Sequence, residues 1–332
     1  MQRTISYKKK LQQFVKRVSR QENAIHIIIT LVLVISLAAI SKGRTITPSN
    51  IRNVFLQSSI RGVAAVGQAF AILTGNFDLS VGGVATTTAL LGAATLTSKV
   101  EYNILSAPLG ISAGIALMLS YGLGVGIVNG LSISRLRMSS VIVTLATWQI
   151  TNGIAYQIGR GKSIGGLPQS LAFIGQGDIA GVAVPLVIFI IAAISAYFIL
   201  NHTVFGKSIY AVGGNPLNAY LCGIDIRKYI LSAFLISGFL ASLAGIMSMT
   251  RAMTGSLQVA RGLELDSIAS VVVGGVSLAG GRGTLIGVVF GVMIMGIINN
   301  GMIITGLYPP LQEMVKGLII ISAVAADTMR SR

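Results

Sequence analysis

The sequence predicts an all-α membrane protein: a polytopic helical bundle of about ten transmembrane segments, with broken, Gly-rich helices. Apolar residues make up 53% of the 332 residues and charged residues only 10%, whereas a soluble chain needs roughly a quarter of its residues charged. No apolar stretch alternates with polar residues over the length that a membrane β-barrel strand requires. The 40 glycines lack the strict three-residue repeat of collagen and are typical of closely packed membrane helices.

Basic residues at the start of the chain predict its orientation. The first 23 residues hold seven basic residues and one acid, and an apolar run follows directly. Such a cluster marks the cytoplasmic flank of a first spanning helix. We therefore expect a basic cytoplasmic segment (1–23), a transmembrane domain (24–326) and a cytoplasmic tail (327–332). Segment 1–23 is either a short interfacial helix on anionic lipid or a disordered tail, and the net charge of +16 indicates membrane lipid and not nucleic acid as its partner.

Apolar stretches then recur along the chain. The predicted spans cover residues 24–40, 54–74, 84–97, 109–131, 141–158, 179–200, 229–249, 268–279, 285–298 and 311–326. Several are shorter than the roughly 20 residues that cross a bilayer, which predicts helices broken at Gly-rich turns. Gly126 and Gly130, and the trio Gly287, Gly291 and Gly296, predict faces where helices pack closely. Arg61 lies inside the second span, and the sequence names no partner for its charge.

No catalytic or metal-binding constellation is predicted. Gly161-Lys162-Ser163 resembles the end of a phosphate loop, but Tyr156 stands where that motif needs glycine. The chain has two histidines and a single cysteine, Cys222, which support neither a metal cluster nor a hydrolase triad. We therefore expect a non-catalytic protein that binds no cofactor, so any ATP-driven step needs another subunit.

Two Gly-rich breaks interrupt the apolar pattern. Asp78 occupies the first, between Asn76 and Ser80, and a carboxylate near mid-bilayer costs roughly 2.5 to 3.5 kcal/mol unless it is compensated. It either caps the helix that starts near Val81 or contacts a solute, and both roles are compatible. The second break, residues 273–283, contains Ser277, and the matching pair of breaks hints at an internal repeat. We expect the two acids just before it, Glu264 and Asp266, to lie in a solvated loop and cap the following helix.

Residues 201–228 form the longest polar stretch inside the chain and are predicted to be cytoplasmic. Within them, the pattern predicts a short helix that starts after Asn215 with Pro216 in its first position and ends at Gly223. This helix either exposes Leu217, Tyr220 and Leu221 to a partner or lies against the bundle.

These residues resemble the permease subunits of bacterial ABC importers of the ribose, arabinose and galactose type. The resemblance runs from about residue 50 to residue 326 and rests on LTGNFDLSVG (73–82), VTLAT (143–147), FGKSIYAVGGN (205–215) and LDSIASVVVGG (265–275). The family has Gly-Gly-Ile where this chain has Gly75-Asn76-Phe77, and acidic residues where Pro216 and Leu217 stand.

The resemblance implies a multi-pass protein of the bacterial inner membrane, and the basic N-terminal cluster with an even number of spans predicts that both termini are cytoplasmic. Its implied partners are a second permease copy or a paralogue, a cytoplasmic ABC ATPase that binds ATP and Mg²⁺, and a periplasmic or lipid-anchored solute-binding protein. Ala219 and Gly223 match positions of the helix that docks into the ATPase. The implied ATPase-coupling residues are Asn215, Leu217, Asn218, Ala219, Tyr220 and Gly223.

We expect the two breaks to line the solute pathway. The candidate pathway residues are Asn76, Asp78, Ser80, Thr144, Thr147 and Ser277. A neutral lining suits a monosaccharide or a similar hydroxyl-rich solute, which hydrogen bonds hold without burying charge. Two alternatives remain open: a branched-chain amino acid permease of related build, and an ion-coupled secondary carrier in which Asp78 titrates or binds Na⁺.

Overall fold

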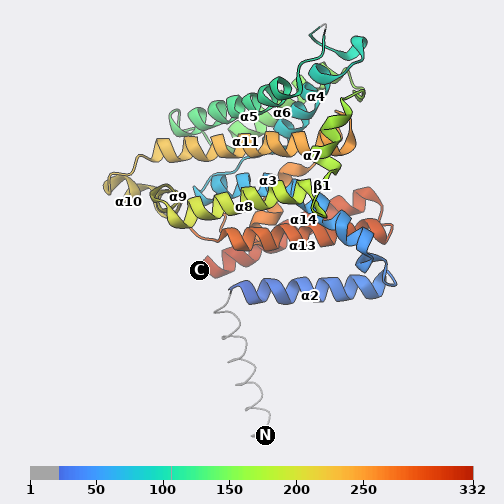
Figure 1. Ribbon diagram of the computed structural model, residues 1–332. Coiled ribbons are helices and arrows are strands. Elements are labelled where there is room, and N and C mark those ends of the chain that lie inside the picture. Colours follow the sequence, from blue (N-terminus) through green and yellow to red (C-terminus); the bar gives the residue numbers. More distant parts are fainter. Residues whose placement is uncertain (1–21, 106, 332) are drawn as a thin grey trace.

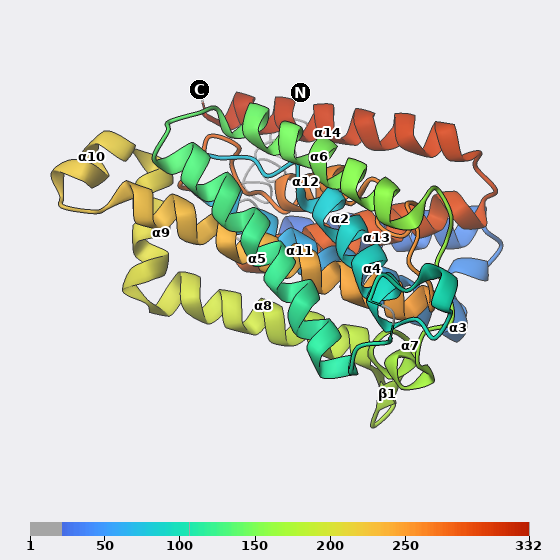
Figure 2. The ribbon, with the colours of Figure 1, turned by 90° about the horizontal axis from the view of Figure 1, so that it is seen from above.

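Long helices packed side by side form the body of the protein in this computed structural model, which describes residues 22–105 and 107–331. Figure 1 shows them running along one common direction, with the short helix α10 at one end of the bundle and α7 with strand β1 at the other. In the perpendicular view of Figure 2, α14 and α8 lie along opposite edges. Except for residues 22 and 23, the predicted basic segment 1–23 lies outside the described residues.

Helices dominate both halves of the described chain. The elements of the first half are α2 (Glu22–Ile40), η1 (Arg44–Ile46), α3 (Pro48–Leu73), α4 (Val81–Leu96), η2 (Val100–Tyr102), α5 (Ile111–Ser134) and α6 (Ser140–Gly159). Those of the second half are η3 (Gln169–Leu171), α7 (Ala172–Gln176), β1 (Asp178–Ile179), β2 (Val182–Ala183), α8 (Val184–His202), α9 (Val204–Gly214), α10 (Pro216–Leu221), α11 (Ile226–Ala252), α12 (Leu263–Val273), α13 (Leu285–Ile304) and α14 (Pro309–Ser331).

A helix forms in each of the ten predicted spans, but the helices differ in length and polarity. Among the described residues, α5, α8, α11 and α13 are long and apolar enough to cross a membrane. The 16 residues of α4 and the 11 of α12 extend only about 24 Å and 16 Å at 1.5 Å per residue, short of the roughly 30 Å hydrocarbon core. The helical membrane bundle is thus established, and the number of crossings stays a prediction.

Two predicted span boundaries were wrong. The span expected to start at residue 179 begins as a hairpin, in which β1 and β2 pair in antiparallel fashion around Ala180 and Gly181, both with positive φ. The span expected over 268–279 is the helix α12, which starts at Leu263 and ends at Val273, because Gly275 takes a φ of 84° that breaks the helix. At the other end of the chain, α14 continues to Ser331, so most of the predicted tail is helical.

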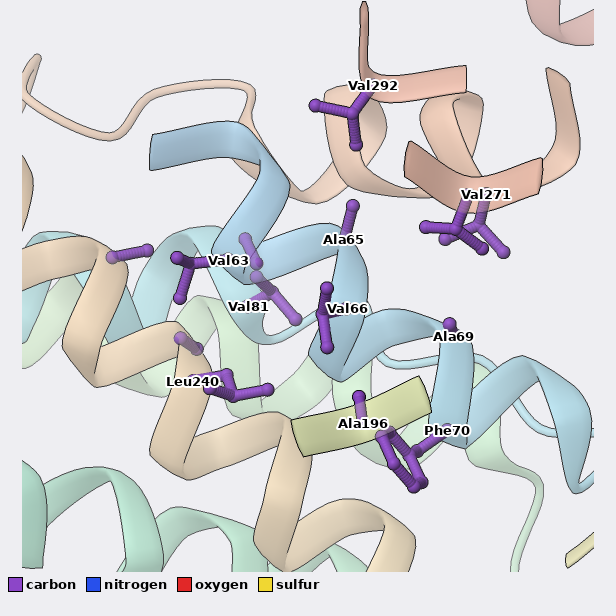
Figure 3. Close-up of a cluster of buried hydrophobic side chains, with 14 of the residues drawn as sticks. Val63, Ala65, Val66, Ala69, Phe70, Val81, Ala196, Leu240, Val271 and Val292 are labelled. Carbon is purple, nitrogen blue, oxygen red and sulfur yellow. The ribbon is translucent and has the colours of Figure 1, made fainter. Parts of the chain in front are cut away.

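The second half of α3 forms the centre of the bundle. Every residue from Gly62 to Leu73 is buried, in contact with α11, α13, α12 and α8. Figure 3 shows Val66, Ala69 and Phe70 of this helix among side chains from its neighbours. Small side chains keep the helices close, and burying this apolar surface fixes the frame on which the polar breaks are mounted.

Glycines allow the closest helix contacts, as predicted. A Cβ atom on Gly126 of α5 would lie 2.6 Å from the carbonyl oxygen of Phe234 on α11, and one on Gly291 of α13 would lie 2.0 Å from that of Ser270 on α12. These distances leave no room for a side chain, so the predicted packing role of both glycines is confirmed.

Helix α2, the first in the described part of the chain, lies farther from the centre of the bundle than α3. It packs chiefly against α13, at the edge of the bundle in Figure 1. Just after it, at the start of α3, Asn50 exchanges side-chain hydrogen bonds of 2.8 Å and 2.9 Å with Asn300 of α13. The beginning of the described chain is therefore held by an element near its end.

Candidate functional site

Asp78 lies at the centre of a buried hydrogen-bond network in the first break, residues 74–80. Its side chain is 1% exposed. One carboxylate oxygen accepts hydrogen bonds from the Ser80 N–H (3.0 Å) and hydroxyl (2.5 Å), and the other accepts one from the Ser237 hydroxyl of α11 (2.6 Å). With its amide group oriented to satisfy both partners, Gln68 of α3 pairs with the backbone of Asp78. The carboxylate is therefore compensated by hydroxyl donors, with no cation among its described partners.

The network continues from Ser80 into two further helices. Asn129 of α5 donates to the Ser80 hydroxyl at 2.9 Å, and Thr147 of α6 donates to the Asn129 side-chain oxygen at 2.7 Å. The structure thus brings together three of the predicted pathway residues: Asp78, Ser80 and Thr147. Sequence reasoning missed Asn129 and Ser237, whose only signal is a polar residue inside an apolar span.

Thr144, also predicted, supports the backbone of the same break. Its hydroxyl oxygen accepts the Leu79 N–H at 3.0 Å, and the Ser140 hydroxyl accepts the Phe77 N–H at 3.2 Å. These bonds satisfy donors that an interrupted helix leaves free. Helix α4 then begins at Val81, the predicted position. The Asp78 carboxylate accepts the N–H of Ser80, the residue just before this helix, and not an N–H of the helix itself.

The second break, predicted at 273–283, comprises residues 274–284 between α12 and α13 and meets the end of α3 through its backbone. The Gly281 N–H donates to the Leu73 carbonyl oxygen at 3.0 Å. Ser277 lies apart from the Asp78 network: its hydroxyl and the Leu278 N–H both donate to Asp327 of α14 at 3.1 Å. The other five candidate pathway residues lie in the first break or are linked to it by hydrogen bonds. Ser277 does neither.

Helix α10 has the local structure that the sequence predicted. The Asn215 side chain accepts the Asn218 N–H at 2.9 Å as an N-terminal cap, Pro216 follows it, and Gly223 has a φ of 80°. Ala219 is buried, whereas the other apolar side chains of this helix project outward. Those side chains are Leu217 (67% exposed), Tyr220 (67%) and Leu221 (73%).

A cavity of about 640 Å³ connects this helix to the first break. Asn76 lines it, as do Tyr220 and Gly223 from the α10 region, and charged residues such as Arg137 and Arg227 complete the wall. Asn76 is thus placed beside two predicted coupling residues and not beside the buried carboxylate of Asp78. Tyr220 of α10 thus forms part of the wall of this cavity.

The charge of Arg61 is neutralised inside the bundle. Its guanidinium pairs with Asp266 of α12 at 3.0 Å, and Lys316 of α14 pairs with the same carboxylate at 3.1 Å. The prediction that Asp266 lies in a solvated loop was therefore wrong: Asp266 is 4% exposed and belongs to α12. Burying Arg61 requires a compensating charge, which outweighs the preference of Asp266 for water.

Glu264 also lies inside the bundle, against the first turn of α4. A Cβ atom on Gly82 would clash with its carboxylate, so the beginnings of α4 and α12 meet at this point. Beside them is a cavity of about 280 Å³. Its wall offers aromatic and hydrogen-bonding side chains, namely Thr86, Trp148, Asn152, Tyr156, Gln258 and Glu264. Apart from Glu264, sequence reasoning singled out none of these residues, because they come from three separate segments.

Comparison with known proteins identifies the family. Residues 50–324 match the family described as "Branched-chain amino acid transport system / permease component", and the chain belongs to it. The ribose import permease protein of Escherichia coli (strain K12) is 33% identical over 91% of this chain and 93% of its own length. The corresponding values are 33%, 91% and 90% for the D-allose transport system permease protein of the same strain, and 33%, 86% and 81% for the L-arabinose ABC transporter permease protein of Azospirillum brasilense.

No solved structure matches the chain. Family membership and the apolar helices together make it a multi-pass membrane protein of the permease class. The resemblance inferred from the four sequence motifs is thereby confirmed.

Proposed function

We propose that this protein is the permease subunit of an ATP-driven importer that moves a monosaccharide or a similar polyol-like solute into the cytoplasm. The relatives named above are permeases for ribose, D-allose and L-arabinose, which favours a sugar over a branched-chain amino acid despite the family's description. In this proposal the chain supplies the path through the membrane, and a partner ATPase hydrolyses ATP with Mg²⁺. Membership of a permease-component family also argues against an ion-coupled carrier.

The exposed apolar side chains of α10 carry the proposal. This helix is capped at its start and stopped at Gly223, so it is a built element and not a frayed loop. It nevertheless exposes Leu217, Tyr220 and Leu221 at one end of the bundle. Apolar side chains gathered beyond the ends of the apolar spans favour a protein partner, and the coupling ATPase is the partner that such an importer needs.

Charge distribution supports a cytoplasmic position for the α10 end. The link that joins α5 to α6 carries Arg135 and Arg137. Helix α9 carries Lys207, and the first turn of α11 carries Arg227 and Lys228. Such a basic group favours the cytoplasmic side. Figure 1 places the start of α2 and the end of α14 at this same end. We therefore propose that both termini are cytoplasmic and that a solute-binding protein, periplasmic or lipid-anchored, delivers the solute at the α7 end.

Inside the membrane, we propose that the solute path includes the cavity beside the beginnings of α4 and α12. Trp148 and Tyr156 provide flat apolar faces, and Asn152 and Gln258 provide amide donors and acceptors. Such a wall suits the apolar ring faces and hydroxyl edges of a sugar. In the assembled importer, a second permease copy or a paralogue would complete the wall of this path.

Replacing one exposed side chain of α10 tests the proposal. In cells that carry the complete importer, Leu217→Asp should leave the amount of protein in the membrane unchanged and abolish uptake of labelled D-ribose, D-allose or L-arabinose, whichever the intact importer moves. Cys222→Ser changes an exposed neighbour by one atom and adds no charge, so it is the matched control and should transport normally.

Three outcomes would contradict the proposal. Normal uptake by Leu217→Asp would remove the coupling role of α10. Competition by leucine but by none of the three sugars would favour an amino acid permease. Uptake that survives deletion of the ATPase and follows a Na⁺ gradient would favour an ion-coupled carrier.

A further inference from the structure

Four cationic side chains line one cavity near the α7 end of the bundle. The cavity has a volume of about 380 Å³ and is lined by Arg61, Arg251, Arg261 and Lys316, with Asp266 as the one carboxylate in its wall. A hydrogen bond of 2.8 Å from Gln176 to the Arg251 carbonyl oxygen ties this place to the end of α7. The volume falls within the range of roughly 300 to 1,000 Å³ that small-molecule sites occupy.

Asp266 does not neutralise this group of cations. It already pairs with both Arg61 and Lys316. Among the ion pairs of the described residues, none includes Arg251 or Arg261, and the one described side-chain partner of Arg261 is the neutral Gln258 at 3.4 Å. Arg61 additionally has a buried guanidinium nitrogen, Nη1, with no hydrogen-bond partner.

Nearby acids do not change this balance. Glu313 pairs with Lys316, but its side chain is 62% exposed, so solvent screens its charge. Glu264 points to the first turn of α4 and lines the adjoining cavity, so the two cavities together are lined by four cations and two carboxylates and keep a positive balance. Arg251 is half-buried and Arg261 is exposed, so the cost of an unpaired cation inside a membrane protein, which commonly marks a pathway or a binding site, applies to Arg251. The cavity therefore offers an oxyanion the guanidinium groups of Arg251 and Arg261 without requiring either to leave an ion pair of the described residues.

The cationic cavity adjoins the aromatic and amide-lined cavity beside α4. Arg261 and Ala260 line both. The first cavity thus offers charged donors, and the second offers Trp148, Asn152 and Tyr156. A ligand that matches both walls carries hydroxyl groups along its length and a negative group at one end. Arginine favours such a group because its planar fork binds carboxylate and phosphate oxygens in pairs.

We propose that the two adjoining cavities form one binding site for an anionic polyol, a sugar that carries a carboxylate or phosphate group. This inference rests on the proposed function in taking the ligand to be the transported solute. It changes the expected solute class, because a neutral lining was predicted from the sequence and the structure places Arg61, Arg251, Arg261 and Lys316 around the site.

Ligand binding to the full-length protein tests the inference without the ATPase. The protein is placed in phosphatidylcholine nanodiscs, and binding of D-ribonate, D-ribose 5-phosphate, D-ribose and inorganic phosphate is measured by saturation-transfer NMR for the sugars and by competition for phosphate. D-Ribonate, D-ribose 5-phosphate or both should bind, with D-ribose at least about tenfold weaker, because it lacks the charged group.

Substitution of Arg251 locates the binding. Arg251→Gln removes a cation that pairs with no described acid, so the fold should persist, and affinity for the bound anionic sugar should fall at least about tenfold. Asn152→Ala should weaken the same sugar but leave competition by inorganic phosphate unchanged. Arg52→Gln is the matched control: it removes an arginine that pairs with Asp178 on the surface, and it should bind like the unmodified protein.

The possible outcomes separate the explanations. Equal binding of D-ribose and both anionic sugars, no binding of either anionic sugar, or unchanged affinity in Arg251→Gln would overturn the inference. Loss of the anionic sugar when phosphatidylglycerol is added to the nanodiscs would assign the cations to a lipid headgroup and also overturn it. Uptake of D-ribose by the complete importer without binding of an anionic sugar would defeat this inference alone, whereas binding without uptake of any sugar would defeat the proposed function alone.

Discussion

Both breaks interrupt helices inside the bundle, and different contacts hold each of them in place. Side chains hold the first break: the Asp78 carboxylate collects hydroxyl groups from Ser80 and Ser237, and Thr144 binds the backbone. The second is held in its middle by backbone contact, where Gly281 donates to Leu73, with side-chain hydrogen bonds to Asp327 and from Tyr210 on either side. The first break therefore depends on which polar groups are present, and the glycines at the centre of the second depend on the absence of side chains. Substitutions should have graded effects in the first and all-or-none effects at the centre of the second.

The largest loss of stability is expected where Gly213 of α9 packs against the backbone of both Leu73 and Gly281. A Cβ atom on Gly213 would lie 1.8 Å from the Leu73 carbonyl oxygen and 2.6 Å from the Gly281 nitrogen. Both are backbone atoms that cannot rotate away, so Gly213→Ala should lower the free energy of unfolding by about 3 kcal/mol or more. The yield and melting temperature of the detergent-purified protein measure this loss.

The neighbouring glycine provides the control. A Cβ atom on Gly214 would have its nearest neighbour at 3.9 Å, an ordinary contact, so Gly214→Ala should change the free energy of unfolding by no more than about 0.5 kcal/mol. Equal stability of the two alanine variants would show that the breaks do not depend on close backbone contact.

An intermediate effect is expected at the carboxylate of the first break. Asp78→Ala leaves the Ser80 and Ser237 hydroxyls without their charged acceptor inside the bundle. The free energy of unfolding should fall by about 2 to 3 kcal/mol, since hydrogen bonds to charged groups are stronger than neutral ones. Asp78→Asn keeps one oxygen acceptor and should recover at least half of the loss in the same melting assay. A graded series would support side-chain control, and an Asp78→Ala protein as stable as the original would contradict it.

The smallest effect is expected at the contact of α14 with the second break. Asp327 accepts two hydrogen bonds, from Ser277 and Leu278, but this carboxylate is only partly buried. Asp327→Ala should therefore lower the free energy of unfolding by about 1 kcal/mol. Glu313→Gln, which removes an exposed pair on the same helix, should cost no more than about 0.5 kcal/mol. A loss as large as that of Gly213→Ala would mean that side chains hold the centre of the second break as well.

Much of the helical framework was predictable, because long apolar runs leave few alternatives in a membrane. The α10 cap was predictable for a local reason: Asn215, Pro216 and Gly223 each favour one backbone conformation. The hairpin before α8 was not, since Ile179 and Val182 suit an apolar helix equally well.

Contacts between distant segments were the part that the sequence concealed. Asn129 and Ser237 are single polar residues in apolar helices, and nothing local shows that α5 and α11 bring them toward Asp78. The position of Asp266 was predicted wrongly because a charged, Gly-rich stretch is typical of a solvated loop. Only the fold shows that Arg61, distant in the sequence, lies beside it. The cationic cavity likewise gathers residues from α3, α11 and α14.

The peripheral packing of α2 against α13 has a consequence for how the protein is made. Its partner begins at Leu285, so the ribosome must add most of the chain before the contact can form. At about 5 to 20 residues per second, this delay is roughly 10 to 50 s. During that interval α2 must be stable in the membrane without α13. Its many exposed apolar side chains, Ile28, Leu31 and Ile35 among them, suit it to contact lipid directly.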